Sequence, residues 1–302
     1  MLRSLFISVL NKLGRLINRR IVYFPEQVAV NNFTAVKSSV GFWYSGNVLD
    51  MSDIAHGILY NGVVEPDGTQ LVLNILKQLQ TKQEELVFYD IGANTGYFGV
   101  MAAYIGKGKI HTYSFEPIKK NNLIESETLS LNNLNSLCDI YNVALGDISG
   151  EAEFFLAGSG SSLSKDFLGN RHSKLDKVKV PVYKLDEFAQ LHNLKLPDFM
   201  KIDVEGFELQ VLKGSQRIIS LSYPVIWYES ALTANSNNFK NNSFFDTQSN
   251  LQNLGYKVFL CSPELQEVKS DKIVDGVSMY LALHLERHKD LLAVIGRLHA
   301  KN

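Results

Sequence analysis

The chain has 302 residues, of which 45% are hydrophobic and 20% are charged, and its formal net charge is -1. This composition is that of an ordinary globular protein and excludes disorder across most of the chain, and the length suffices for one large domain or for a domain with additions at either end. A net charge near zero gives no global reason to expect a nucleic-acid partner.

Cysteine usage and hydropathy bear on the compartment. The two cysteines, Cys138 and Cys261, have no CxxC or Cys/His neighbour that would indicate a metal site or a disulfide framework. The sequence has no run of about 18 or more apolar residues, so a membrane-spanning helix is not expected. We therefore predict a reducing, cytoplasmic setting.

The first twenty residues, MLRSLFISVLNKLGRLINRR, predict a basic amphipathic helix over residues 1–20. Their apolar side chains recur at helical spacing, and most of the arginines and lysines lie off that stripe. Asn11, Lys12 and Arg15 interrupt the apolar stretch that a secretory signal would need. The helix either packs on its own domain or on a second subunit, or lies on an anionic membrane as a peripheral contact at the inner face.

Residues 21–68 are rich in Asn, Ser and Gly and predict a lead-in segment of short strands and loops. From residue 69 to residue 80 the apolar spacing predicts a helix. The elements predicted after it are, in chain order, a strand ending at Asp90, a helix near 97–106, a strand at 109–115, a helix near 118–132 and a strand near 137–144.

The second half continues the alternation. Residues 150–184 read as strands around a Gly/Ser-rich loop, in which Ser161 and Ser162 either contact substrate hydroxyls or belong to a plain hairpin. The later elements are the helix LDEFAQLHNL, the strand DFMKIDV, the helix FELQVLKGSQRIIS, the strand PVIWYES, a helix and strand near 245–260, and the strand VSMYLALH. Strands that alternate with helices predict an α/β fold with a mostly parallel sheet and helices on both faces. This domain would span residues 69–285, with a C-terminal tail at 286–302.

The stretch VFYDIGANTGYF, residues 87–98, joins the first strand of this sheet to a glycine turn. In a doubly wound sheet the ligand lies at the carboxyl ends of the strands. A dinucleotide turn requires G-x-G-x-x-G, but this turn reads D-x-G-x-N-x-G, with Tyr97 where the third glycine would fall. A pyrophosphate is therefore disfavoured. A ligand without phosphate, such as S-adenosylmethionine, needs a carboxylate near its amino group and main-chain contacts, which Asp90 and residues 92–96 can supply.

The second strand ends in YSFEP and puts Glu116 at its tip. A carboxylate there can accept both hydrogen bonds from a ribose diol. NAD would use such an acid too, so Glu116 indicates a ribose-containing ligand and leaves both cofactors open. The glycine turn and the acid together favour S-adenosylmethionine.

The motifs DIGANTGYF, SFEP, NVALGD, SGSSL, KLDEF, MKIDVEGFELQVLKG and VIWYES follow one another in the chain. In this order and spacing the sequence resembles the FkbM-type methyltransferases over roughly residues 65–285. The resemblance implies a class I, S-adenosylmethionine-dependent enzyme with a seven-stranded Rossmann-like sheet. It also implies O-methylation, often of sugar hydroxyls in glycans, glycolipids or secondary metabolites.

The same resemblance implies a cofactor site. The methionine part of S-adenosylmethionine would be surrounded by Asp90, Gly92, Asn94 and Gly96. Glu116 would bind its ribose, and Asn142 and Ala144 in NVALGD would lie along its adenine.

Methyl transfer to an alcohol needs an aligned nucleophile and an acceptor for its proton. In KIDVEGFE, Asp203 closes the fourth strand and Glu205 lies just beyond it, at the ligand-bearing edge. We predict Asp203 nearest the methyl group, Glu205 as a base or substrate ligand, and Glu229 at the tip of VIWYES as a further base. Glu205 and Glu208 can alternatively cap the following helix.

Asp203, Glu205 and Glu229 offer oxygen ligands that would suit magnesium. Because acids on separate strand tips do not establish a cage, no metal is predicted.

Two other functions stay open at this point. A nicotinamide-dependent oxidoreductase is disfavoured by the missing third glycine. A catalytically inactive methyltransferase fold that serves as a binding module is disfavoured because Asp90, Glu116 and Asp203 are all present. The leading prediction is an O-methyltransferase that acts on a hydroxyl of a sugar, glycan or glycolipid precursor.

Overall fold

The computed structural model divides into two compact units, Met1–Val64 and Glu65–Asn302. It describes residues 34–157, 161–164, 175–232, 239–261, 265–268 and 276–299. The amphipathic helix predicted for residues 1–20 lies outside the described residues, so its contact with a membrane stays a prediction. Among the helices that the structure describes, none combines the length and the apolar character that a membrane crossing needs.

The described part of the first unit is a strand pair followed by a helix. Strands β1 (Thr34–Lys37) and β2 (Trp43–Gly46) pair antiparallel. Helix α2 (Ile54–Asn61) begins after Asp53, whose side chain accepts a hydrogen bond from the main chain of the first turn, and it ends at Gly62 in the left-handed conformation. The lead-in segment, predicted as strands and loops, therefore also contains a helix.

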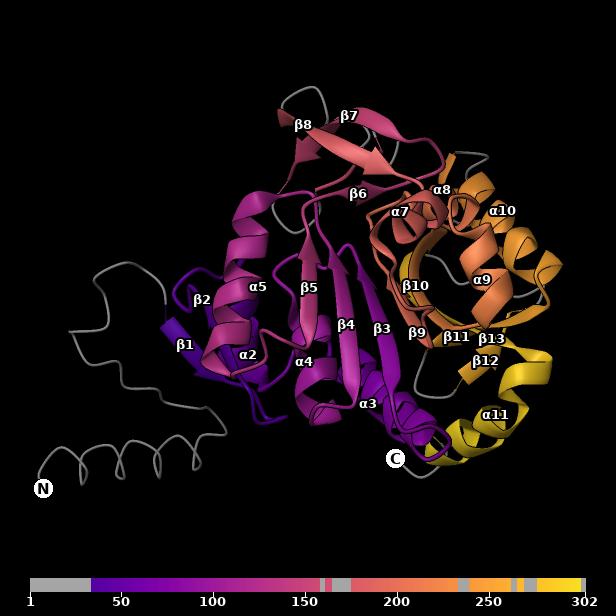
Figure 1. Cartoon of the computed structure of the whole chain (residues 1–302), viewed down its shortest axis with the longest axis horizontal. Coiled ribbons are helices and arrows are strands. Elements are labelled where there is room, and N and C mark those ends of the chain that lie inside the picture. The colour runs from indigo at the N-terminus through magenta and orange to yellow at the C-terminus, as the bar shows by residue number, and fades with distance from the viewer. Residues whose placement is uncertain are drawn as a thin grey trace, which may run out of the picture. The chain divides into compact units, whose positions relative to one another are not determined.

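The second unit is built on an eight-stranded sheet with the order β12-β11-β13-β10-β9-β3-β4-β5 (Figure 1). Its strands are β3 (Leu86–Ile91), β4 (Ile110–Phe115), β5 (Cys138–Tyr141), β9 (Phe199–Ile202), β10 (Val225–Leu232), β11 (Tyr256–Cys261), β12 (Leu265–Glu267) and β13 (Gly276–His284). The pairs from β5 to β10 are parallel, and the pairs of β13 with β10 and β11 are antiparallel. The predicted α/β fold with a mostly parallel sheet is confirmed, and the short strand β12 adds an eighth strand at one edge.

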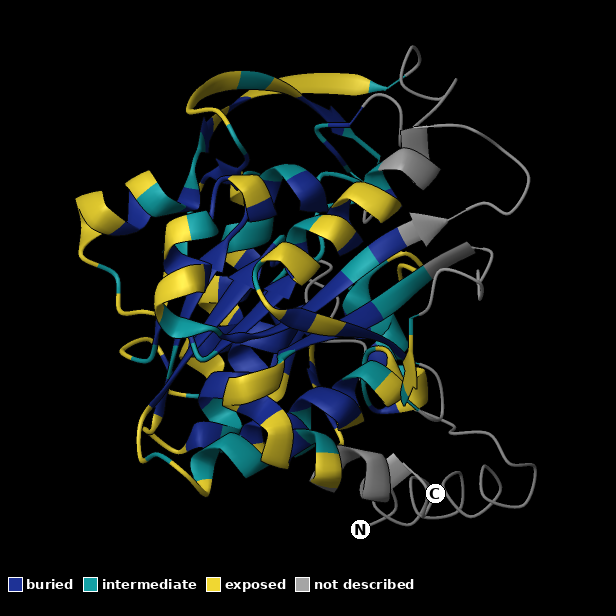
Figure 2. Cartoon of the chain, turned by 90° about the vertical axis from the view of Figure 1, so that its right-hand side faces the viewer, coloured by how far each residue is buried: buried dark blue, intermediate teal, exposed yellow. Residues whose placement is uncertain are grey.

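Helices cover both faces of this sheet, so its strands are buried between two layers (Figure 2). Helices α3 (Pro66–Gln80), α4 (Tyr97–Gly106), α5 (Lys119–Leu131) and α11 (Leu285–His299) form one layer, and helices α7 (Leu185–His192), α8 (Glu208–Lys213), α9 (Gln216–Ser222) and α10 (Phe239–Asn253) form the other. All six residues of β3 are buried. A parallel strand covered on both faces reads as a continuous apolar run, which is why this part of the fold could be predicted.

A second, three-stranded sheet stands apart from the central one. Strands β6 (Ala144–Leu145), β7 (Gly150–Leu156) and β8 (Asp176–Tyr183) pair in the order β6-β8-β7. The single strand predicted near 137–144 is therefore wrong, because β5 ends at Tyr141 and Ala144 pairs in the small sheet. The side chain of Asn142 donates to two main-chain carbonyls of another loop; such side-chain bonds compete with the strand ladder.

The single helix predicted for FELQVLKGSQRIIS is also wrong, because it is two helices, α8 and α9. At Gly214 the chain passes so close to Gly146 that an added Cβ would overlap the Gly146 carbonyl. The carboxylate of Asp186 then accepts hydrogen bonds from the main-chain N–H groups of Arg217 and Ile218, in the first turn of α9. The break therefore depends on contacts with distant segments.

The core beneath the site can be tested at Phe199, whose ring stacks on Phe88 at 5.0 Å between centroids. Both side chains are fully buried. Phe199→Ala should lower the free energy of unfolding by about 3 to 5 kcal/mol in urea denaturation, because it removes apolar contacts and leaves a cavity. Leu221→Ala, at a side chain that is 58% exposed, is the control and should change it by less than about 0.5 kcal/mol. Equal effects of both substitutions would contradict this packing.

Candidate active site

The glycine turn follows β3 at the point where the strand order reverses between β3 and β9. Gly92 has φ +72°, and a Cβ there would overlap the main-chain carbonyl of Asp203. Gly96 has φ +80°, and a Cβ there would collide with the buried side chain of Glu125. Asn94 between them also has a positive φ, of 52°. The two glycines are therefore required both by conformation and by close approach.

The side chain of Asp90 faces away from the turn opening. It is fully buried, and its Oδ2 accepts a hydrogen bond of 2.8 Å from the Gly99 N–H in α4. Asp90 is paired in register with Lys201 of β9. Because side chains alternate along a strand, Asp90 lies on the face that α4 covers, where its carboxylate joins the strand to the helix.

Lys201 connects the turn to the acids beyond β9. Its buried Nζ lies 3.2 Å from Asp203 Oδ2 and 3.6 Å from Asp90 Oδ1, and it donates to the Gly92 carbonyl at 3.2 Å. Burial by itself would lower the pKa of Lys201, but the carboxylates of Asp203 and Asp90 outweigh burial and hold the pKa of Lys201 above its usual value. Lys201 is therefore a fixed cation under the turn.

A cavity opens at the carboxyl ends of β3, β4 and β9. The predicted site residues that line it are Gly92, Asn94, Glu116, Ala144, Asp203 and Glu205. Four others are not among its lining residues: Asp90, Gly96, Asn142 and Glu229. Their predicted roles stay predictions.

Glu116 is held in place by donors from two sides. Its Oε2 accepts from the Asn94 N–H at 3.0 Å, and its Oε1 accepts from the Ile118 N–H at 2.9 Å and from the Asn121 side chain at 3.3 Å. Burial raises the pKa of Glu116 to about 7, although these donors oppose the shift. The carboxyl is therefore oriented at the cavity wall before any ligand arrives.

Sequence reasoning missed several lining residues. Asn121 lies in the first turn of α5, five positions after Glu116, and this spacing could have signalled it. Phe154, Ser161 and Leu163, which we call the roof of the cavity, belong to β7 and the segment after it. Of these, Phe154 and Leu163 were missed, whereas Ser161 was predicted either to contact substrate hydroxyls or to belong to a plain hairpin. The pairing of the small sheet brings the roof over the cavity. No spacing in the sequence indicates that Phe154 and Leu163 line it.

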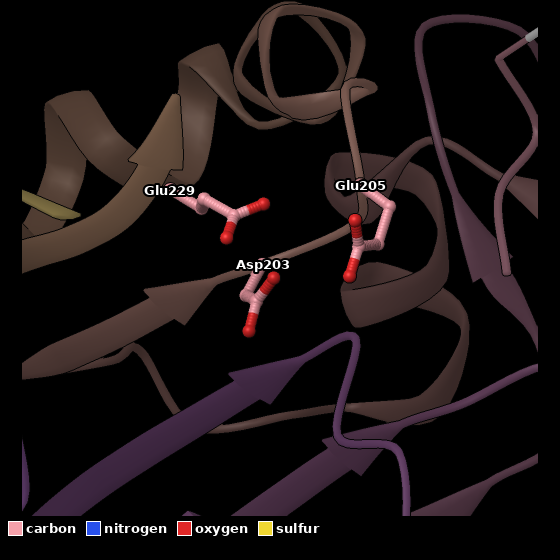
Figure 3. A group of neighbouring side chains, drawn as sticks. All are labelled: Asp203, Glu205 and Glu229. Atoms are coloured by element: carbon pink, nitrogen blue, oxygen red, sulfur yellow. The ribbon is translucent and has the colours of Figure 1, made fainter. Parts of the chain in front are cut away.

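Figure 3 shows the carboxylates of Asp203, Glu205 and Glu229 pointing toward one another. One oxygen from each lies within 4.8 Å of the other two. The structure brings together three oxygen ligands, which the sequence alone did not establish. That no metal is used stays a prediction.

The pKa of Glu229 is strongly perturbed. Burial, followed by the nearby carboxylates of Asp203 and Glu205, raises the pKa of Glu229 to about 9. Glu229 therefore holds a proton at neutral pH. Perturbed carboxyl groups at the edge of a cleft are typical of functional sites.

The sequence model of the methyltransferase FkbM domain matches residues 90–258, which is more than half of the chain. The chain belongs to this FkbM methyltransferase family. Membership of this family favours a methyltransferase over the nicotinamide-dependent alternative.

Relatives of this FkbM methyltransferase are distant. The hexuronic acid methyltransferase AglP of Haloferax volcanii is 28% identical over 149 residues, which are 49% of this chain and 56% of AglP. The methyltransferase FkbM structure from Methylobacillus flagellatus is 18% identical, with a TM-score of 0.43, and the match covers 66% of this chain and 44% of that one. An O-methyltransferase from Bacillus cereus in complex with SAH is 15% identical, with a TM-score of 0.44 over 92% of this chain and 99% of that one. These TM-scores are too low to transfer details of a site.

Gly92→Ala tests the close approach of the turn. We expect it to weaken S-adenosylmethionine binding in calorimetry by more than about tenfold, because a displacement of about 1 Å in a site can cost a hundredfold. Gly108→Ala is the matched control, since Gly108 has φ +88° with nothing near its Cβ position. It should lower the free energy of unfolding by about 1 to 2 kcal/mol, because alanine is strained in the left-handed conformation. The affinity for S-adenosylmethionine should stay unchanged. Equal binding by the Gly92 variant and wild type would contradict the geometry.

Glu229→Gln tests the placement of the protonated acid. The folded chain keeps a proton on Glu229 up to about pH 9, whereas the ordinary pKa is 4.5. The stabilisation that this proton gives the folded state is complete below the ordinary pKa of 4.5 and is lost as the pH rises through the folded-state pKa of about 9.

Urea unfolding should therefore show a smaller fall in the free energy of unfolding between about pH 6 and about pH 9 for Glu229→Gln than for wild type. Glu151→Gln, at an exposed position of β7, is the control. Parallel curves for the Glu229 variant and wild type would rule out the raised pKa.

Proposed function

We propose that this methyltransferase transfers the methyl group to a hydroxyl of a sugar, in a glycan or a glycolipid precursor. The observation that carries the proposal is the meeting of Asp203 and Glu205, which line the cavity, with Glu229, whose carboxylate lies close to theirs. Carboxyl groups gathered there can bind hydroxyls and accept a proton, and both tasks belong to methylation of an alcohol.

The groups that line the cavity suit S-adenosylmethionine. In our proposal Gly92 and Asn94 contact the methionine part, Glu116 accepts from the ribose hydroxyls, and Ala144 lies along the adenine with Leu145. The oriented carboxyl of Glu116 and the close main chain at Gly92 support this assignment. When bound, S-adenosylmethionine supplies a methyl group that is already activated for displacement.

The acids would divide the remaining work. Asp203, held by Lys201 at 3.2 Å, lies nearest the methyl group in this proposal and binds the acceptor hydroxyl. Glu205 lines the cavity and takes the proton as the base. Glu229, protonated at neutral pH, donates a hydrogen bond to the acceptor.

The acceptor class rests on a relative and on the absence of any reason to expect nucleic acid. AglP, which this chain matches over 49% of its length, is by its name a methyltransferase of a hexuronic acid. We extend this to a sugar acceptor here, without specifying a uronic acid, and place the enzyme in the cytoplasm or at the inner face of a membrane.

Asp203→Ala tests the proposed centre. Turnover should fall by about 10²-fold, because the acceptor hydroxyl loses the group that aligns it and a misplacement of about 1 Å can cost that much. S-adenosylmethionine should bind the wild type with micromolar affinity in calorimetry. Because Ala removes a partner of the buried Lys201, Asp203→Asn provides a second variant that keeps the side-chain volume.

A screen of sugar nucleotides and glycans for methyl acceptance, read by mass spectrometry, identifies the acceptor for this assay. Full activity of folded Asp203→Ala would remove Asp203 from the mechanism. A folded wild type that does not bind S-adenosylmethionine would overturn the proposal.

A further inference from the structure

Glu205 points into the acid cluster from a strained main chain. Its φ is +56°, in the left-handed region that residues with a Cβ seldom adopt, and Gly206 follows with φ +92°. Such a conformation persists only where the surroundings hold it. The contacts around residues 204–206 therefore decide where the Glu205 carboxylate lies.

Ser162 holds this turn from the side of the small sheet. Its side chain is fully buried, and its Oγ donates to the Glu205 carbonyl at 2.7 Å while accepting from the Ser164 N–H at 2.8 Å. Ser162 stands between the roof residues Ser161 and Leu163. The predicted contact of Ser162 with substrate hydroxyls has no support in this burial, because the hydroxyl is occupied by main-chain groups.

Glu208 holds the same turn from the side of α8. It is buried at the first position of the helix, and its Oε1 accepts from the N–H groups of Val204 and Gly206, both at 3.1 Å. These N–H groups belong to the residues before and after Glu205. Ser162 thus fixes the carbonyl of Glu205, and Glu208 fixes the N–H groups of its two neighbours.

We propose that Ser162 and Glu208 are positioning residues for methyl transfer, which fix Glu205 in the left-handed conformation that directs its carboxylate toward Asp203 and Glu229. The proposal rests on the role of Glu205 in the proposed function. It also links the roof of the cofactor cavity to the acid cluster, since the residue that bonds to Glu205 lies within the roof segment.

The roof does not depend on the Ser162 hydroxyl. The main chain of Ser162 forms a bridge with Phe155, with N–H to O distances of 3.0 and 3.1 Å. That bridge survives the loss of the side-chain oxygen, so the roof stays over the cavity in Ser162→Ala. The substitution therefore separates the positioning of Glu205 from cofactor binding.

The test compares four variants in the full chain: Ser162→Ala, Glu208→Leu, Glu208→Gln and Ser215→Ala. Hydrogen exchange of peptides covering residues 203–207, followed by mass spectrometry, reads the turn directly and needs neither cofactor nor acceptor. Ser215→Ala is the matched control, since Ser215 is equally buried and its Oγ donates to the Val211 carbonyl at 2.6 Å. Turnover with the acceptor found by the screen and S-adenosylmethionine affinity are measured alongside.

We expect faster exchange at residues 203–207 in Ser162→Ala and Glu208→Leu, with turnover lowered about 5- to 10-fold by the loss of one hydrogen bond and more by the loss of two. The affinity for S-adenosylmethionine should stay within about twofold in Ser162→Ala, because the bridge to Phe155 remains. Glu208→Gln keeps an oxygen acceptor of the same size and should preserve most of the turnover and protection. Ser215→Ala should change neither readout.

Unchanged hydrogen exchange at residues 203–207 in Ser162→Ala would overturn the proposal. If Glu208→Leu does not fold, the result for Ser162→Ala decides alone. Loss of turnover in Glu208→Gln as severe as in Glu208→Leu would also overturn it, because Glu208 would then handle a proton itself. In a Glu205→Gln background Ser162→Ala should have little further effect on turnover; an undiminished effect would show that Ser162 does not act through Glu205. If no sugar acceptor is found, the exchange data still decide, so the two proposals fail separately.

Discussion

The buried ammonium of Lys201 is the interaction on which the site depends. It lies between Asp90 of β3 and Asp203 after β9, and it donates to the carbonyl of Gly92. Two carboxylates could not share this interior without a cation, and breaking such a buried network leaves an uncompensated charge at a cost of about 3 to 5 kcal/mol. The glycine turn and the acid that follows β9 are thus held at a fixed separation by one side chain, at the point where the strand order reverses.

The central sheet could be predicted because its strands are buried on both faces. The apolar runs of β3 and β10 and the helical spacing of α3 and α4 read directly from the sequence. The break between α8 and α9 could not, since it follows from the approach of Gly214 to Gly146, 68 positions earlier in the chain. The exit of the chain from β5 likewise depends on bonds from Asn142 to the loop after β4. Both are tertiary effects that override local preference.

For the candidate site, the sequence does not show the directions of the side chains. Gly92 and Glu116 line the cavity, and their roles stay predictions. Asp90 turns to α4 because side chains alternate along β3 and α4 packs on the face opposite to the side chains of Tyr89 and Ile91, which a sequence does not show. Phe154 and Leu163 of the roof were missed because the pairing of β7 with β8 and the bridge between Phe155 and Ser162 bring them to the cavity. The conformation of Glu205 was missed because nothing in KIDVEGFE marks a left-handed glutamate.

The small sheet has a consequence for how this scaffold can change. Strands β6, β7 and β8 form a continuous insertion between β5 and α7, and they pair as a sheet of their own. The strands of the central sheet keep their partners whatever the insertion contains, so its length and side chains can drift while the glycine turn and Lys201 stay in register. One contiguous piece of the chain thus shapes the roof of the cavity. Changes confined to that piece would reshape the roof while the strand pairing beneath it stays the same.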